Sequence, residues 1–208
     1  TVIVISGYSQ GGAVALGVAR LVEEHKTIDS AGGANRKDWA IRKLYAGAGP
    51  YDPAGTYLYS LERDEMGIPA AIPLIVMGLN DAYDMGLDLD DFFLEPLLSN
   101  YEAWIESKEY TVGEINQLMG STTMSELMTE DMLSLDTPQA DALYQVLSWN
   151  SNVGYNLQSP AYFLHSLDDE VVPLLNTINL QTQMPNNLDK IFDINHYGSH
   201  METSIVFM

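Results

Sequence analysis

The segment Gly7-Tyr8-Ser9-Gln10-Gly11 combines residue types that suit a nucleophilic serine. An apolar, β-branched run over residues 2–5 precedes it and predicts a strand, and an amphipathic stretch over residues 13–24 follows it and predicts a helix. Glycines on both sides of a serine in so sharp a turn would prevent collisions and leave its hydroxyl accessible. The helix would direct its positive end and the Gln10 amide toward a developing oxyanion. The segment therefore predicts Ser9 as a nucleophile and Gln10 as an oxyanion donor.

Carboxylates and histidines follow two later runs that also read as strands, residues 161–165 and 190–194. The first run leads into His165-Ser166-Leu167-Asp168-Asp169-Glu170-Val171-Val172-Pro173, and the second into Asn195-His196-Tyr197-Gly198-Ser199-His200. A serine nucleophile requires a base, and the base requires an orienting carboxylate. These two segments supply the candidates for both.

Together, these motifs resemble the α/β-hydrolase superfamily of serine esterases and lipases. In that family a strand followed by an "HG…D-x-V-V-P" loop carries the acid, and the chain order is serine, acid, histidine. The resemblance implies that Asp169 is the acid, with Ser166 standing where glycine is usual. It implies that His200 is the base, because this histidine follows a Gly-Ser turn and directly precedes an expected final helix over residues 201–207. No metal or cofactor is implied.

Several alternatives remain open at this point. Asp168 is a rival acid and His196 a rival base. Asp52 is a second rival acid, since some related hydrolases carry the acid after the preceding strand, although a turn-forming role explains it better. His165 precedes the acid and is expected to be structural, and His25 is expected to be a solvated surface residue.

Strand-like runs alternate with helix-like stretches, which predicts an α/β fold with a parallel sheet. Residues 1–60 are expected to form the nucleophile strand, its helix and a second strand over 41–46, with a polar loop over 27–39. Residues 61–150 are expected to form a helical cap, and residues 151–208 the part of the core with the acid and histidine loops. Another helix is expected over residues 173–183.

The expected cap differs in composition from the rest of the chain. Residues 61–140 contain 17 of the 29 acidic residues and seven of the ten methionines, with only two basic residues. Thr111 with Glu114, and Thr123 with Glu126, match capping boxes, and Thr137 precedes a proline suited to the first position of a helix. An insertion at this place, after Gly47-Ala48-Gly49-Pro50-Tyr51-Asp52, resembles the lipase A-type secretory lipases and their bacterial relatives. In that group a helical cap covers the site and shapes the acyl pocket.

The resemblance implies hydrolysis of small-molecule carboxylic esters through an acyl-enzyme. The methionine, leucine and tyrosine residues of the cap would suit an apolar acyl or alkyl group, but they could equally hold the cap helices together. A prolyl-oligopeptidase-like peptidase is one alternative, and a non-catalytic binding protein on a hydrolase scaffold is another.

Composition limits the other partners. A formal net charge of −20 disfavours nucleic acid and anionic membranes as partners, and the lack of cysteine excludes disulfides and thiolate metal sites. No apolar run has the roughly 20 residues that span a membrane. Secretion or a cell-envelope location is expected from the resemblance, with any targeting signal upstream of Thr1.

The nucleophile strand normally lies in the middle of a hydrolase sheet, yet residues 2–5 are the first element of this sequence. The run is apolar on both faces and has no lysine or proline to protect an edge. We therefore expect the chain to be the C-terminal part of the fold. Its N-terminal half would come from the same gene, a proteolytic piece or a partner chain, and would supply a second oxyanion donor.

Two further segments resemble ligand sites only superficially. The acid-rich stretch over residues 80–91 lacks the spacing of a calcium-binding loop, and a solvated approach to a helix is the expected role. Gly47-Ala48-Gly49 lacks the continuation of a dinucleotide-binding motif.

Overall fold

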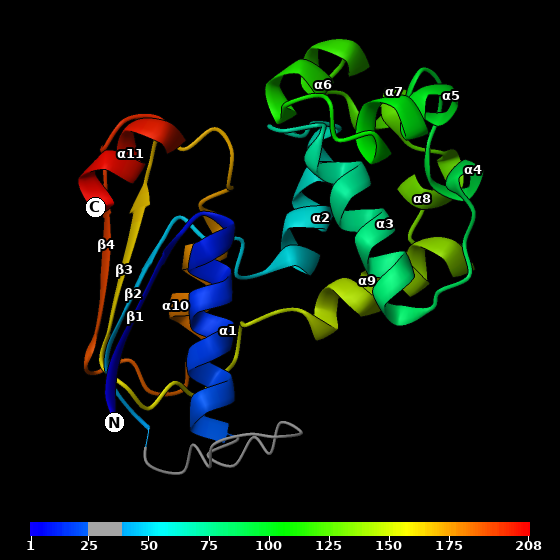
Figure 1. Ribbon diagram of the computed structural model, residues 1–208. Coiled ribbons are helices and arrows are strands. Elements are labelled where there is room, and N and C mark those ends of the chain that lie inside the picture. The colour runs from blue at the N-terminus through cyan, green and yellow to red at the C-terminus, as the bar shows by residue number, and fades with distance from the viewer. Residues whose placement is uncertain (25–38) are drawn as a thin grey trace. The chain divides into compact units, whose positions relative to one another are not determined.

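The computed structural model describes residues 1–24 and 39–208. It divides into two compact units (Figure 1). Thr1–Thr56 together with Ser151–Met208 form the sheet unit, and Tyr57–Asn150 form the helical unit. His25 and nearly all of the polar loop expected over residues 27–39 lie outside the described residues.

The sheet unit contains four parallel strands in the order β1-β2-β3-β4. They span Val2–Tyr8, Ala40–Gly47, Ala161–Ser166 and Lys190–Asn195. Parallel neighbours need crossover connections, which are α1 (Gln10–Glu24), the helical unit and α10 (Leu175–Gln183). Each strand lies where an apolar run predicted one, and the expected α/β class is confirmed.

Helices α1 and α10 cover one face of the sheet. Side chains at helical spacing on α1 and alternate residues of the central strands meet in one buried cluster. Its members are Ala15, Leu16, Ala19, Leu44, Ala46, Tyr51, Leu157, Ala161, Phe163, Leu180 and Met184. Packing of α1 against both β1 and β2 fixes the direction in which the helix leaves the turn at Ser9.

The opposite face is covered only at the carboxyl ends of the strands, as far as the described residues show. There α11 (His200–Phe207) brings its last ring against Tyr8, with 5.5 Å between the ring centroids. Farther down this face, Val2 and Val4 of β1 are 68% and 58% exposed. The sequence predicted a strand covered on both faces, so β1 differs from that expectation: Ile3 and Ile5 are half-buried, whereas the alternate residues Val2 and Val4 are exposed.

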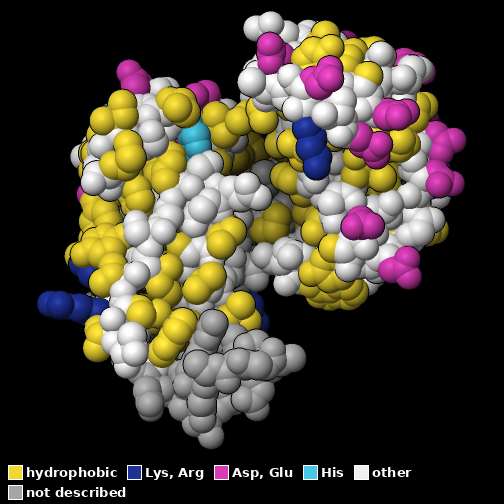
Figure 2. All heavy atoms as spheres, in the orientation of Figure 1, with side chains coloured by type: hydrophobic (Ala, Val, Ile, Leu, Met, Phe, Trp, Pro, Cys, Tyr) yellow, Lys and Arg dark blue, Asp and Glu magenta, His cyan; other side chains and the backbone are white. Residues whose placement is uncertain are grey.

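Helix α2 (Pro53–Arg63) begins in the sheet unit and continues into the helical unit from Tyr57 on. The helical unit also contains a series of mostly short helices. These are α3 (Ala71–Tyr83), α4 (Leu89–Phe92), α5 (Leu97–Tyr101), η1 (Glu102–Glu106), α6 (Val112–Met119), α7 (Met124–Leu127), α8 (Glu130–Leu133) and α9 (Pro138–Trp149). Acidic side chains gather on its surface in Figure 2. Its interior is lined by aromatic residues, leucines and methionines, with Phe92, Phe93, Met124, Met128 and Met132 all at most 2% exposed.

Helix starts in this unit follow the predicted caps, with one exception. Thr111 and Glu114 form the expected capping box, and the Thr137 hydroxyl caps α9 by accepting from an amide of its first turn. At α7 the helix begins after Thr123 as predicted, but no side-chain capping bond forms there. The predicted capping box at Thr123 is therefore wrong, because the Glu126 carboxylate accepts from the Ser121 hydroxyl instead.

No helix within residues 1–24 or 39–208 combines the length and apolar character needed to cross a membrane.

Candidate active site

Ser9 occupies a strained turn between β1 and α1. Its φ of 57° lies in the left-handed region, which residues other than glycine rarely adopt. Such a conformation costs about 1–3 kcal/mol and persists only where neighbouring contacts enforce it. Here the Ser9 amide donates to Gly47 O at 2.8 Å, and the Ser9 carbonyl accepts from the Gly12 amide at 2.8 Å. Helix α1 therefore begins directly after the serine, at Gln10, three residues before the expected start at Ala13.

The glycines around Ser9 have different roles. A Cβ added at Gly7 would lie 2.0 Å from Gly11 O, and one added at Gly12 would lie 2.8 Å from Gly47 O. A Cβ at Gly11 would meet nothing within 4 Å. The expectation that glycines on both sides prevent collisions thus holds for Gly7, where a Cβ would collide with the Gly11 backbone. It is wrong for Gly11, where a Cβ would collide with nothing. Gly12 instead permits the close approach of α1 to the end of β2.

The structure brings Ser9, His200 and Asp169 together from three separate segments. His200 Nε2 lies 2.9 Å from Ser9 Oγ, and His200 Nδ1 lies 2.7 Å from Asp169 Oδ2. A carboxylate only accepts, so the ring proton is assigned to Nδ1, and Nε2 is left to accept from the serine hydroxyl. This is the protonation state that a general base requires. His200 is the first residue of α11 rather than the residue before it.

The Asp169 carboxylate is buried but well supplied with donors. Its Oδ1 accepts from the amides of Val171 and Val172 at 2.9 and 2.8 Å, while Oδ2 faces the His200 ring. Burial alone would raise the pKa of the Asp169 carboxyl, but the hydrogen bonds from His200 and the two amides hold it below its ordinary value. The carboxylate therefore stays ionised near neutral pH and can stabilise a protonated imidazole.

His165 is hydrogen-bonded to the loop that carries Asp169. Its Nε2 lies 3.0 Å from Val172 O and its Nδ1 lies 2.6 Å from the Thr177 hydroxyl. Because a carbonyl only accepts, the proton is assigned to Nε2, and Nδ1 accepts from Thr177. Burial lowers the pKa of His165 despite the attraction of Asp169, so the ring stays neutral. His165 contacts the acid loop, in keeping with the structural role expected for it.

The rival acid and the rival base pair with each other. His196 Nδ1 lies 3.0 and 2.9 Å from the two carboxylate oxygens of Asp168. Both side chains are exposed, at 71% and 48%. Asp52 has a different role again: its carboxylate accepts from the Gly55 amide at 3.0 Å, in the first turn of α2, and from the Asn179 side chain at 2.7 Å. None of these three hydrogen-bonds to Ser9 in the described structure.

Ser166 links the acid loop to the histidine loop. Its buried hydroxyl donates to Gly198 O at 2.7 Å and accepts from the amides of Asp168 and Tyr197 at 3.1 and 3.2 Å. The sequence marked Ser166 only as a departure from the glycine of the family motif. A serine in place of that glycine, at the end of an expected core strand, needs hydrogen-bond partners if it is buried. The substitution was therefore the feature of the sequence that could have indicated a linking role for Ser166.

Gln10 is the first residue of α1. Amides in the first turn of a helix have no acceptor within the helix. The Gln10 N–H, which directly follows Ser9 in the chain, therefore has no acceptor within the helix. An oxyanion donor must be available in this way.

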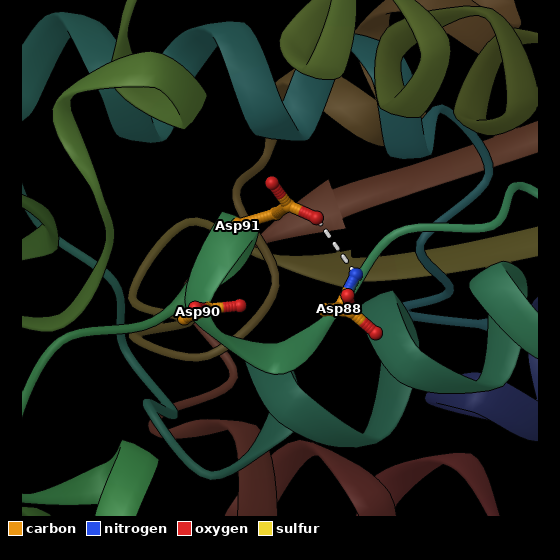
Figure 3. A group of neighbouring side chains, drawn as sticks. All are labelled: Asp88, Asp90 and Asp91. Atoms are coloured by element: carbon orange, nitrogen blue, oxygen red, sulfur yellow. Dashed lines mark hydrogen bonds between the residues drawn. The ribbon is translucent and has the colours of Figure 1, made fainter.

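The acid-rich stretch of the helical unit forms a local cap. Asp88, Asp90 and Asp91 present oxygens within 4.8 Å of one another (Figure 3). Asp91 Oδ2 accepts from the Asp88 amide at 2.7 Å, and the two residues form a capping box at the start of α4. Capping accounts for the proximity of Asp88 and Asp91.

Comparison with known proteins shows the fold. No family model matches the chain, and no curated protein matches its sequence. Among solved structures, the rice cell wall degrading esterase LipA from Xanthomonas oryzae superposes with a TM-score of 0.75 at 18% identity, covering 99% of this chain and 54% of that one. Candida antarctica lipase A in its closed state superposes with a TM-score of 0.55 at 17% identity, covering 96% of this chain and 44% of that one. The chain thus spans about half the length of these proteins, and the likeness to the esterase and lipase fold of α/β hydrolases is confirmed.

Proposed function

We propose that this chain carries the nucleophile, base and acid of a serine hydrolase that cleaves carboxylic esters through an acyl-enzyme. The observation that supports the proposal is the continuous set of hydrogen bonds from Ser9 Oγ through the His200 ring to Asp169. The strained backbone at Ser9 adds to it, because strained residues of this kind are concentrated at active sites. The similar solved structures are named as an esterase and a lipase, which favours ester substrates.

In the proposed reaction, Ser9 Oγ attacks the carbonyl carbon of the ester while its proton passes to His200 Nε2. Asp169 stabilises the imidazolium that results and holds its orientation. The negative charge that develops on the carbonyl oxygen is stabilised by the Gln10 N–H and the positive end of α1. The tetrahedral intermediate then expels the alcohol, which takes the proton from His200 Nε2.

The acyl-enzyme is hydrolysed by the same groups. His200 Nε2 accepts a proton from a water molecule, whose oxygen attacks the acyl carbon. Collapse of the second intermediate breaks the bond to Ser9 Oγ, and the serine recovers its proton from His200. The products are one alcohol and one carboxylic acid, and the site returns to its starting protonation state.

The proposed substrate is an ester with an apolar acyl or alkyl group. This preference rests on the resemblance to the lipases. The methionines of the helical unit support it less, because Met119, Met124, Met128 and Met132 are buried within that unit and serve its packing. Rates on esters of increasing acyl length would reveal the preference. Secretion or a cell-envelope location stays a prediction.

A second part of the proposal concerns the free edge of β1. This strand lies at one end of the described sheet, and Val2 and Val4 are exposed on it. Edges of this kind pair readily with further strands. We propose that strands of the same gene product, a proteolytic piece or a partner chain add to β1 and contribute a second oxyanion donor.

The deciding experiment compares Ser9→Ala with Ser6→Ala in the natural gene product. Ser6 is an exposed serine on β1, the strand that leads into Ser9, so its variant controls for a generic loss of a hydroxyl. Ser9→Ala should abolish hydrolysis of p-nitrophenyl esters and labelling by a fluorophosphonate probe, whereas Ser6→Ala should keep both. Faster turnover of proline-linked amides than of esters would favour a peptidase. Retained activity in folded Ser9→Ala would refute the proposal.

A further inference from the structure

The main chain of His200 is held by two residues that adjoin its side-chain partners. Tyr8, directly before Ser9, donates from its hydroxyl to His200 O at 2.6 Å. Glu170, directly after Asp169, accepts from the His200 amide at 3.0 Å through Oε2. The segments that carry the proposed nucleophile and acid therefore bind the histidine twice, once at its ring and once at its backbone.

We propose that Tyr8 and Glu170 are positioning residues that fix the His200 main chain and thereby the approach of its Nε2 to Ser9. The inference rests on the proposed hydrolase function. With both backbone polar groups bound, the ring can move only about its side-chain torsions, and the bond to Asp169 restricts these. Proton transfer between His200 and Ser9 depends steeply on this geometry, because a displacement of about 1 Å can reduce a rate about 10²-fold.

Tyr8 is suited to this role by its packing and its protonation state. Its ring contacts the imidazole of His200, at 5.1 Å between centroids, and the ring of Phe207, at 5.5 Å. Burial, followed by the negative charge of Asp169, raises the pKa of Tyr8 to about 12. The hydroxyl therefore remains a donor over the whole range in which a histidine base works.

Glu170 supplies an acceptor that the helix itself lacks. His200 is the first residue of α11, and an amide at that position has no partner inside its helix. The Ser199 hydroxyl caps a different amide, that of Glu202 at 3.3 Å. The Glu170 carboxylate binds the first N–H of the helix, that of His200, and places its charge at the positive end of the helix.

Among the described residues, side-chain hydrogen bonds therefore join His200 to four groups: Asp169 at Nδ1, Ser9 at Nε2, Tyr8 at the carbonyl and Glu170 at the amide. The contacts that Tyr8 and Glu170 make here are with His200 itself, so they act on it rather than on a bound ester. Loss of either contact should lower kcat and leave KM nearly unchanged.

The test uses Tyr8→Phe, Glu170→Ala and Glu170→Gln in the natural gene product. Tyr8→Phe keeps the ring and removes one hydrogen bond, which should lower kcat about three- to tenfold. Glu170→Ala should lower kcat about tenfold, as expected for a bond to a charged group. Glu170→Gln retains an oxygen acceptor without the charge, so it should recover most of that loss. Changes in KM should stay within about twofold.

Two matched controls address less specific effects. Tyr162→Phe removes a tyrosine hydroxyl that bonds to Asp193 rather than to His200. Asp168→Asn removes a carboxylate of the same loop that pairs with His196. Both controls should keep the wild-type kcat. Urea unfolding of every variant separates an altered site from an unstable protein, and Tyr8→Phe decides the matter if Glu170→Ala does not fold.

A second measurement needs no turnover. The NMR resonance of the His200 Nδ1 proton reports its hydrogen bond to Asp169, and it should shift in Tyr8→Phe and Glu170→Ala but not in the controls. Wild-type kcat and an unshifted resonance in both variants would overturn the inference. Equal losses of kcat in Glu170→Gln and Glu170→Ala would show that Glu170 acts through its charge and not by positioning His200. Activity retained in Ser9→Ala would instead refute the hydrolase proposal itself.

Discussion

His165 Nε2 lies 3.6 Å from Asp169 Oδ2, and both side chains are fully buried. The two groups do not form an ion pair, because burial lowers the pKa of His165 and keeps its ring neutral. A neutral ring donates to Val172 O and accepts from Thr177, which holds the loop that presents Asp169. The hydrogen bonds that hold the Asp169 loop therefore require His165 Nδ1 to be unprotonated.

This dependence gives the stability of the chain a defined pH response. The unfolded chain takes up a proton at His165 near the ordinary pKa of about 6.5, whereas the folded chain resists protonation until lower pH. The contribution of His165 to stability is therefore present above about pH 6.5 and declines as the pH falls. Urea unfolding between pH 7.5 and pH 5 should show a decline that is smaller in His165→Gln. His196→Gln, which alters an exposed histidine, should retain the wild-type slope, and a wild-type slope in His165→Gln would contradict the explanation.

Asp169→Asn should lower kcat by about four orders of magnitude, because an amide favours the wrong tautomer of the neighbouring histidine. Asp168→Asn changes the adjacent residue in the same way and should keep nearly full activity. Steady-state ester hydrolysis by the two variants measures the difference directly. The reverse ranking would make Asp168 the acid, with His196 as its base.

Gly7→Ala should destabilise the chain, whereas Gly11→Ala should not. A Cβ at position 7 would collide with the Gly11 backbone and displace it. Gly7→Ala should therefore destabilise the chain strongly and reduce any esterase activity. A Cβ at position 11 meets open space, and alanine is the better helix former by about 1 kcal/mol. Thermal unfolding should therefore show an equal or higher Tm for Gly11→Ala. A lower Tm for that variant would count against the geometry of the turn.

Ser166→Ala should destabilise the chain by about 1–3 kcal/mol, because it deprives three buried or partly buried backbone groups of their shared partner. These are Gly198 O and the amides of Asp168 and Tyr197. Ser199→Ala is a suitable comparison, since it removes the cap of α11, typically worth about 1 kcal/mol, without disconnecting the two loops. Urea unfolding measures both. A loss no greater than that of Ser199→Ala would show that the link is weak.

The edge of β1 should make residues 1–208 self-associate when they are produced alone. Val4→Lys places a charge on the exposed face of that strand and should reduce light scattering and sedimentation of large species. Ile191→Lys, at an exposed site of β4, is the matched control and should change association less. A monomeric wild-type chain with full esterase turnover would remove the need for added strands and for a second oxyanion donor.

The sequence by itself determined the local order around the reactive residues. Apolar, β-branched runs cannot be solvated and so specify strands, and the glycine-flanked Ser9 specifies a sharp turn before a helix. The two later strands end in segments rich in acids and histidines, as the sequence indicated. These features depend on short-range sterics and hydrophobic periodicity, which a single chain displays directly.

Tertiary structure decided which of the adjacent acids and neighbouring histidines join Ser9 in one set of hydrogen bonds. Asp168 and Asp169 differ by one residue, and only the folded loop turns one carboxylate outward and the other onto the amides of Val171 and Val172. His200 faces the serine because it begins α11, with its backbone bound by residues 192 and 30 positions away. Contacts across such separations arise only when the strands assemble into a sheet, so no local pattern in the sequence could reveal the bonds of Tyr8 and Glu170 to the His200 backbone.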